Sequence, residues 1–188
     1  SEKIVFGLKA NKTKATFHLL PSAYSFQSYQ EEEIEVSHPY ALVSSGEKKN
    51  ILEFSCRHFY EEGKTNLILC KGKTTANKTA SEIYNGIDHD IKNDEVNLIQ
   101  RYIDEEMGCT SLFSKLLGRG IAVHHAGLSD EVKLLTEHLI RKGLVNYVCA
   151  TTTIAEGVNF PVSSVYFDTY QRGKNNILSA NDFWNIAG

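Results

Sequence analysis

The sequence of 188 residues contains no long apolar run. Its apolar stretches are only a few residues long, whereas a transmembrane helix needs about 20 consecutive apolar residues. The first residues, Ser1-Glu2-Lys3, lead into a mixed segment in which no secretory signal peptide is recognisable. We therefore expect no attachment to a membrane.

Cysteine is also scarce, with four residues at widely spaced positions: Cys56, Cys70, Cys109 and Cys149. None of them forms a Cys-x-x-Cys pair, so a structural zinc site is not expected. Cys70 and Cys149 lie in apolar stretches and are predicted to be small buried residues. Unpaired thiols fit a reducing compartment, and we expect a cytoplasmic protein.

Positive charge is not in excess, because 20 Lys and Arg stand against 23 Asp and Glu and give a net charge of −3. This balance excludes a domain that binds nucleic acid through an overall basic surface. Any contact with nucleic acid must be local, through loops and backbone amides. An apolar content of 41% is typical of one globular domain with a substantial core.

The stretch from Gly118 to Phe167 has the clearest pattern. It contains three apolar runs, at 121–123, 147–150 and 165–167, and an amphipathic helix is predicted at 130–142 between the first two. Each run ends in small or polar residues. This arrangement is typical of a parallel sheet with functional loops at the carboxyl ends of its strands.

The helix at 130–142 has consistent boundary signals. Ser129 is a suitable N-cap, and Gly143 suits the position just past the end. Its apolar residues recur at helical spacing: Val132, Leu135, Leu139 and Ile140. A strand, helix and strand in this order require a parallel pair of strands.

The rest of the chain continues the alternation. Further helices are predicted at 50–62, 76–84, 94–107 and 111–117, with Asp94 as the cap of the third and strands at 15–20, 33–36 and 66–70. We therefore predict an α/β fold of three layers. Its mainly parallel sheet should include strands near 66–70, 121–124, 146–150 and 164–168, with helices on both faces.

The segment Gly72-Lys73-Thr74-Thr75 invites comparison with a phosphate-binding loop. A Walker A motif needs a further glycine five positions before Gly72, and Leu67 stands there. The chain therefore lacks its own Walker A motif.

Two longer motifs resemble a known family. His-His-Ala-Gly-Leu-Ser at 124–129 is similar to motif IVa of the Ski-two-like group of superfamily 2 helicases, and Ala-Thr-Thr-Thr-Ile-Ala-Glu-Gly-Val-Asn-Phe-Pro at 150–161 is similar to motif V. Asn185-Ile186-Ala187-Gly188 looks like the opening of motif VI, with Asn185 where the family usually has glutamine. The resemblance implies the second (C-terminal) RecA-like domain of a helicase of the DEAD/DEAH type.

The resemblance also implies a domain division. Residues 51–188 would form the C-terminal RecA-like domain, up to the start of motif VI. Residues 1–50 would be either the tail of the first RecA-like domain or the connection between the domains, and an extension packed on the same domain is the alternative. Because the chain starts without Met and ends inside a motif, we expect a fragment of a longer protein.

The nucleic-acid contacts that the resemblance implies are made to the backbone by five residues: Lys73, His125, Gly127, Thr151 and Thr152. For the lysine, a solvated loop residue is the alternative. For the threonines, capping of the following helical segment is a further role that is compatible with the first. A histidine metal site is not expected, because adjacent side chains of a strand point to opposite faces and no carboxylate or cysteine nearby completes a ligand set.

The residues implied at the cleft where ATP binds between two RecA-like domains are Gly157, Asn159, Asn185 and Gly188. ATP and Mg²⁺ would be held mainly by the first RecA-like domain, so the fragment alone should bind no cofactor and hydrolyse no ATP. The implied function of the full-length protein is that of an ATP-dependent helicase.

The partners implied by the resemblance are single-stranded or duplex DNA or RNA, together with the first RecA-like domain of the same protein. The competing hypothesis is a non-catalytic α/β module that binds nucleic acid or protein and has lost its coupling to ATP. A third hypothesis, a metal-dependent hydrolase, requires a ligand set that the histidine spacing does not support.

Overall fold

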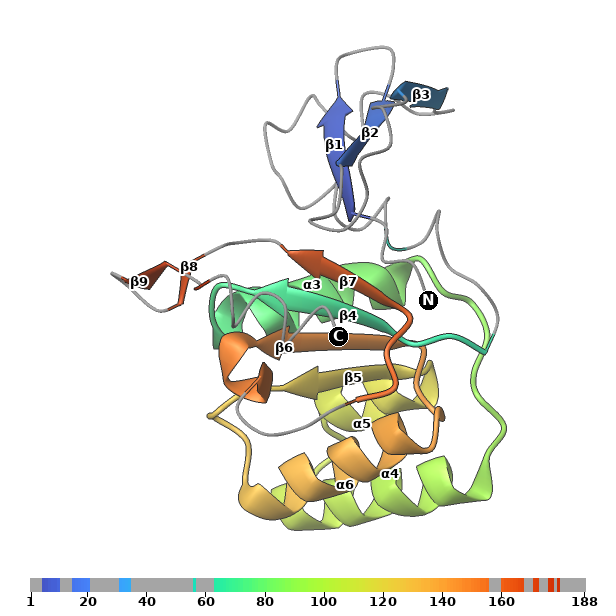
Figure 1. Ribbon diagram of the computed structural model, residues 1–188. Helices are drawn as coiled ribbons and strands as arrows, with labels where there is room; N and C mark the ends of the chain where they lie inside the picture. The colour runs from blue at the N-terminus through green and yellow to red at the C-terminus, as the bar shows by residue number, and fades with distance from the viewer. Residues whose placement is uncertain are drawn as a thin grey trace. The chain divides into compact units, whose positions relative to one another are not determined.

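The computed structural model describes residues 5–10, 15–20, 31–34, 56, 63–155, 160–167, 171–172, 176–177 and 179 (Figure 1). The chain divides into two compact units, residues 1–55 and residues 56–188. Within the described residues, no helix is both long and apolar enough to cross a membrane.

The first unit contains a three-stranded antiparallel sheet. Its strands are β1 (Val5–Ala10), β2 (Ala15–Leu20) and β3 (Glu31–Ile34), in the order β1-β2-β3. β2 occupies its predicted residues, whereas β3 begins two residues earlier than predicted and β1 was not predicted.

The second unit is built on a four-stranded parallel sheet. Its strands are β4 (Asn66–Cys70), β5 (Ile121–His124), β6 (Tyr147–Thr151) and β7 (Ser164–Phe167), in the order β5-β6-β4-β7. All three neighbouring pairs are parallel, and each strand lies within one residue of its predicted bounds. The prediction of an α/β fold with a parallel sheet is confirmed. A separate antiparallel pair, β8 (Gln171–Arg172) and β9 (Asn176–Ile177), follows later in the chain.

The helices described in the second unit are α3 (Lys73–Asn85), α4 (Asp94–Met107), α5 (Leu112–Gly118) and α6 (Asp130–Arg141). Of the helix predicted at 50–62, only Cys56 is described, and it is helical and buried. The predicted start of α3 was wrong. α3 begins at Lys73, three residues before its predicted start, because the Gly72 carbonyl accepts a 2.9 Å hydrogen bond from the Ala76 N–H and closes the first turn earlier.

The N-caps of α4 and α6 show how local sequence sets the helix ends. Asn93, and not the predicted Asp94, caps α4, because its Oδ1 accepts from the N–H groups of Glu95 and Val96 at 2.9 and 3.1 Å. Ser129 caps α6 as predicted, accepting from the Val132 N–H at 3.3 Å. A capping side chain of this kind is worth about 1 kcal/mol.

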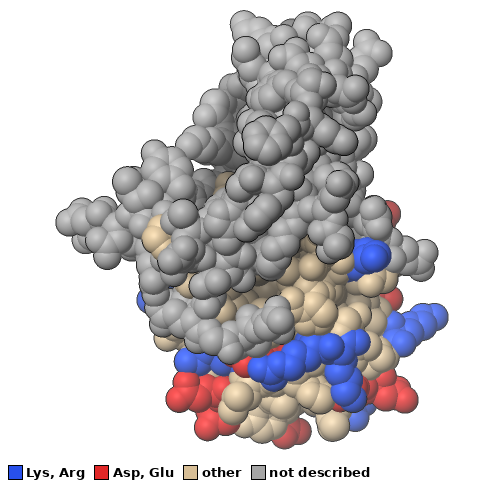
Figure 2. Space-filling view, in the orientation of Figure 1, with Lys and Arg blue, Asp and Glu red and all other residues tan. Residues whose placement is uncertain are grey.

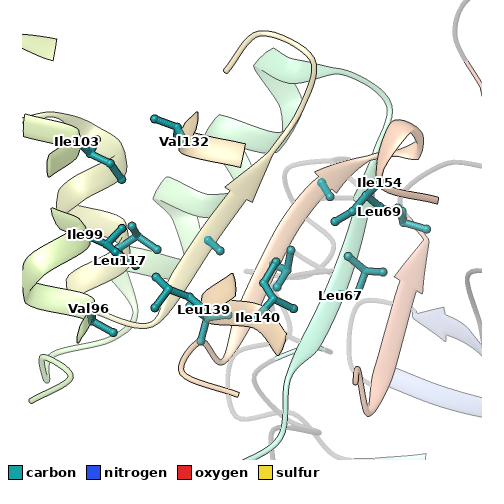
Figure 3. Close-up of a cluster of buried hydrophobic side chains, with 14 residues drawn as sticks. Leu67, Leu69, Val96, Ile99, Ile103, Leu117, Val132, Leu139, Ile140 and Ile154 are labelled. Carbon is teal, nitrogen blue, oxygen red and sulfur yellow. The ribbon is translucent and has the colours of Figure 1, made fainter. Parts of the chain in front are cut away.

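The sheet is covered by helices on both faces, as predicted. On one face, alternate strand residues pack against apolar residues of α4 and α6; Leu67, Leu69, Val96, Ile99, Leu139 and Ile140 are among those in Figure 3. On the other face lies α3, which in Figure 1 runs behind β4 and buries Ala76, Ala80 and Ile83. β4, β5 and all of β6 but its last residue are therefore buried, whereas β7 is partly buried, and this burial restricts the movement of the ends of the three buried strands.

Arg119 fastens the end of α3 to the start of β5. Its guanidinium donates to the carbonyls of Tyr84 and Ile87, and it lies 4.0 Å from the centre of the Tyr84 ring. Carbonyls at a helix C-terminus lack intrahelical partners and carry partial negative charge, so a cation there stabilises the end of α3.

Gly120 occupies the tightest junction before β5. Its φ is +73°, and its carbonyl accepts from the N–H groups of Asn146 and Tyr147 at 2.7 and 3.0 Å. A Cβ at this position would lie 2.6 Å from Cδ1 of Ile91. A residue with a side chain would therefore strain the backbone and displace a neighbour.

We predict that Gly120→Ala lowers the free energy of unfolding by about 1–2 kcal/mol because of the left-handed backbone conformation alone. The displacement of Ile91 should lower it further. Gly143→Ala is the matched control, since Gly143 has φ +66° but open space where a Cβ would lie. Urea denaturation of both variants measures the difference. A loss for Gly120→Ala no larger than that for Gly143→Ala would show that the packing around Gly120 is not restrictive.

Candidate nucleic-acid interface

The predicted nucleic-acid residues that the structure describes lie at one edge of the parallel sheet. Parallel strands place their carboxyl ends together, and β5, β6 and β4 are neighbours in that order. In the register, His124 lies beside Ala150, and Thr151 lies beside Cys70. The segments that leave these strand ends carry the five predicted residues: Lys73, His125, Gly127, Thr151 and Thr152.

The imidazole of His125 is buried, and each of its ring nitrogens forms a hydrogen bond. The Gly127 N–H donates to Nδ1 at 3.1 Å, and Nε2 lies 3.0 Å from Oδ1 of Asn77. Because Nδ1 accepts, Nε2 carries the hydrogen and donates to Asn77. The imidazole therefore holds the turn that follows β5 against α3, and the exposed residues there are Ala126 and Gly127.

The surroundings of His125 favour the neutral ring. Its side chain is buried, and burial lowers the pKa of His125 below its ordinary value of 6.5. Nearby positive charge on Lys73 lowers the pKa further. A neutral ring keeps the Nδ1 lone pair that the Gly127 amide requires, so the shape of the turn depends on this protonation state.

Lys73 is the first residue of α3 and lies next to the same turn. Its Cδ would be 3.5 Å from a Cβ built on Gly127. Gly72, the N-cap of α3, supplies no side-chain cap, and the first turn of the helix contains no acidic residue. The positive end of the helix dipole and the lysine ammonium therefore both create a positive electrostatic potential beside the turn at Gly127.

Asn77 is a site residue that the sequence analysis missed. It lies four residues after Lys73, so both face the same side of α3, and it is the partner of His125. An asparagine inside a helix is unfavourable by propensity, which is a signal that the side chain has a specific contact. Nothing in local spacing indicates a partner 48 residues away.

Thr151 and Thr152 lie at the end of β6, between the other two strand ends. Thr151 is the last residue of the strand, and Thr152 is the first of a 3₁₀ turn, η1 (Thr152–Ala155). Both are partly buried, and Ile154 in the same turn is buried in the core (Figure 3). The four residues predicted at the ATP cleft lie outside the described residues: Gly157, Asn159, Asn185 and Gly188.

The histidine pair does not form a metal site. His124 points to the opposite face of the sheet from His125, and its Nε2 is 3.0 Å from Oε1 of Glu137. The nearness of Glu137 of α6 to this pair was not predicted from the sequence. Among the described residues, no group of three His, Cys, Asp or Glu side chains is arranged to hold a metal ion.

Charge on the described part of the face in Figure 2 is mixed. The face shown in Figure 2 carries Lys and Arg next to Asp and Glu, and neither sign covers it. With a net charge of −3, an electrostatic contact with nucleic acid depends on local groups such as Lys73 and the start of α3.

Several curated proteins match this chain, although no family model does. Hachiman protein HamB of Bacillus cereus is 31% identical over 127 residues, which is 67% of this chain and 11% of the relative. ATP-dependent DNA helicase Hel308 of Pyrococcus horikoshii is 31% identical over 63% of the chain and 17% of the relative. Antiviral helicase SKI2 of Saccharomyces cerevisiae is 42% identical over 39% of the chain and 6% of the relative.

The parallel sheet and these matches together define the RecA-like part of a superfamily 2 helicase. Within that superfamily, the chain belongs to the Ski-two-like group, as part of its C-terminal helicase region. The resemblance inferred from the sequence is confirmed. The matched part makes up less than a fifth of each of the three relatives.

We predict that His125 makes stability sensitive to pH. The pKa of His125 is lowered in the folded state, so the unfolded chain takes up a proton first as the pH falls through about 6.5. The stabilisation from the neutral ring is present above that pH and is lost below it. The free energy of unfolding should therefore fall less between pH 7.5 and 5.5 in His125→Gln than in the unmodified protein.

His89→Gln is the control for this measurement, because His89 is exposed. Urea denaturation at both pH values compares the three proteins. An equal loss of stability in the unmodified protein and in His125→Gln would contradict a neutral, proton-excluding site at His125.

Proposed function

We propose that the full-length protein is an ATP-dependent nucleic-acid helicase in which this domain grips the backbone of one strand. The helicase names of the relatives support this function. The observation that carries it is the meeting of Lys73, the start of α3 and the turn at Gly127 at one edge of the sheet. A phosphate placed there would be near a lysine ammonium and the positive end of a helix.

The chemistry of this edge suits a backbone contact that is independent of base sequence. Lys73 is exposed and provides a point charge, which attracts phosphate without a fixed geometry. Gly127 has no side chain, so a strand can approach the turn closely. His125 would act behind the surface by holding this turn, because both of its ring nitrogens are bonded to protein groups.

Thr151 and Thr152 would extend the contact along the edge, through hydroxyl groups at the end of β6. The segment that follows them carries Gly157 and Asn159, which we assign to the ATP cleft. Asn185 and Gly188 would approach the same cleft. ATP and Mg²⁺ would be bound mainly by the first RecA-like domain, and hydrolysis would move the strand held at the carboxyl edge.

We predict that Lys73→Ala weakens binding of a single-stranded oligonucleotide and lowers its dependence on salt. Each phosphate contact on a single strand contributes about 0.7 to the slope of log affinity against log salt concentration, and this slope should decrease by about that amount. Fluorescence anisotropy with a labelled oligonucleotide at several salt concentrations measures both quantities, in the absence of ATP.

Lys92→Ala is the matched control. Lys92 is also exposed, but it lies next to Ile91, whose N–H bonds to Gly118, on the side of the sheet where β5 begins. The loss of one positive charge there should leave the slope unchanged. If Lys73→Ala and Lys92→Ala gave the same slope as the unmodified protein, Lys73 would be a solvated lysine and the proposed contact would be wrong.

A further inference from the structure

Glu137 links two parts of the domain through its two carboxylate oxygens. Oε1 lies 3.0 Å from Nε2 of His124, at the end of β5, and Oε2 accepts a 3.2 Å hydrogen bond from Nη2 of Arg141. The side chains of Glu137 and His124 are only 14% and 8% exposed. The contact between them is thus shielded from water, which strengthens it relative to a surface pair.

His124 depends on Glu137 for its orientation. Its Nδ1 is buried, and among the described residues no group bonds to it, so the Glu137 contact is the hydrogen bond that orients this ring. The next residue along the chain is His125, which holds Gly127 and contacts Asn77. A shift of His124 would therefore also move His125, the adjacent residue, which holds the turn at the proposed nucleic-acid edge.

The other contact of Glu137 leads towards Phe160. The guanidinium carbon of Arg141 lies 5.9 Å from the centre of the Phe160 ring, within the range of a cation–π contact. Phe160 also packs against the hydrophobic core. In sequence, Phe160 directly follows Asn159, which we assign to the ATP cleft.

α6 gives these two contacts a fixed separation. Glu137 and Arg141 are one helical turn apart on the same side of a helix that is capped by Ser129. Leu139 and Ile140, on the same helix, are fully buried and anchor it to the sheet. The helix therefore holds the contact at the end of β5 at a fixed distance from the contact at Phe160.

We propose that Glu137 is a positioning residue that fixes the proposed nucleic-acid edge relative to Phe160, and so sets how strongly nucleic acid stimulates ATP turnover. This inference rests on the proposed helicase function and adds to it a residue outside the two helicase motifs. Glu137 acts through His124 and Arg141 and touches neither ligand.

Glu137→Gln in the full-length protein tests the proposal. An amide is uncharged and has one acceptor oxygen, so contact with both partners would require its N–H to donate to Nε2 of His124 while its oxygen accepts from Arg141, and both contacts would be weaker than those of the carboxylate. We expect the maximal ATPase rate at saturating nucleic acid to fall about fivefold or more. Binding of the oligonucleotide without ATP should change less, by about twofold at most, because the groups at the strand edge are all present. A purely structural role would instead lower the melting temperature without this separation of turnover from binding.

Lys133→Gln is the control on the same helix. Lys133 lies one helical turn before Glu137 and pairs with Asp130 at 2.6 Å, and among the described residues no hydrogen bond or ion pair joins it to His124 or Arg141. This variant removes a charged pair and should retain the maximal stimulated rate. An equal loss of rate in Lys133→Gln would assign the effect to the net charge or stability of α6 and would overturn the proposal.

Arg141→Gln provides a second test if Glu137→Gln fails to fold. The Arg141 side chain is 51% exposed, so its loss does not open the core. It should lower the maximal stimulated rate in the same direction but by less, because only the link to Phe160 is broken. If both variants kept the stimulated rate of the unmodified protein, the inference about Glu137 alone would be overturned. If the unmodified protein showed no ATPase activity stimulated by nucleic acid, the proposed function itself would be overturned.

Discussion

Parallel pairing of β5, β6 and β4 is the constraint on which the proposed interface depends. It brings the residues that follow three strands, which are far apart in sequence, to one edge of the sheet. Helices on both faces bury these strands and allow little adjustment of their ends. An antiparallel arrangement of the same segments would have separated the residues of motifs IVa and V.

Polar contacts between buried side chains also hold the strand ends at this edge in place. His125 joins Gly127 to Asn77, and His124, on the opposite face, joins β5 to Glu137. The adjacent histidines thus attach one strand end to a helix on each face of the sheet. The motif that contains them combines an exposed turn at Gly127 with two buried histidines, and their hydrogen bonds hold this turn against the helices on both faces.

The sequence allowed most of the fold to be predicted, because apolar periodicity and capping residues are local signals. The four parallel strands and the caps of α6 were found in this way. The start of α3 was missed because Gly72 and the two threonines after Lys73 have low helix propensity, and the turn is closed by a backbone hydrogen bond instead of a side-chain cap. Asn77 and Glu137 were missed because their partners come from distant elements, and spacing along the chain carries no signal for such contacts.

The most direct test of the account is hydrogen exchange of the protein with and without a single-stranded oligonucleotide. The central claim is that the strand lies across the carboxyl ends of β4, β5 and β6. The account predicts slower exchange of backbone amides in residues 71–75, 125–128 and 151–152, with little change in the middle of α4. Protection confined to α4 and the outer side of α6, with unchanged exchange at the three strand ends, would contradict it.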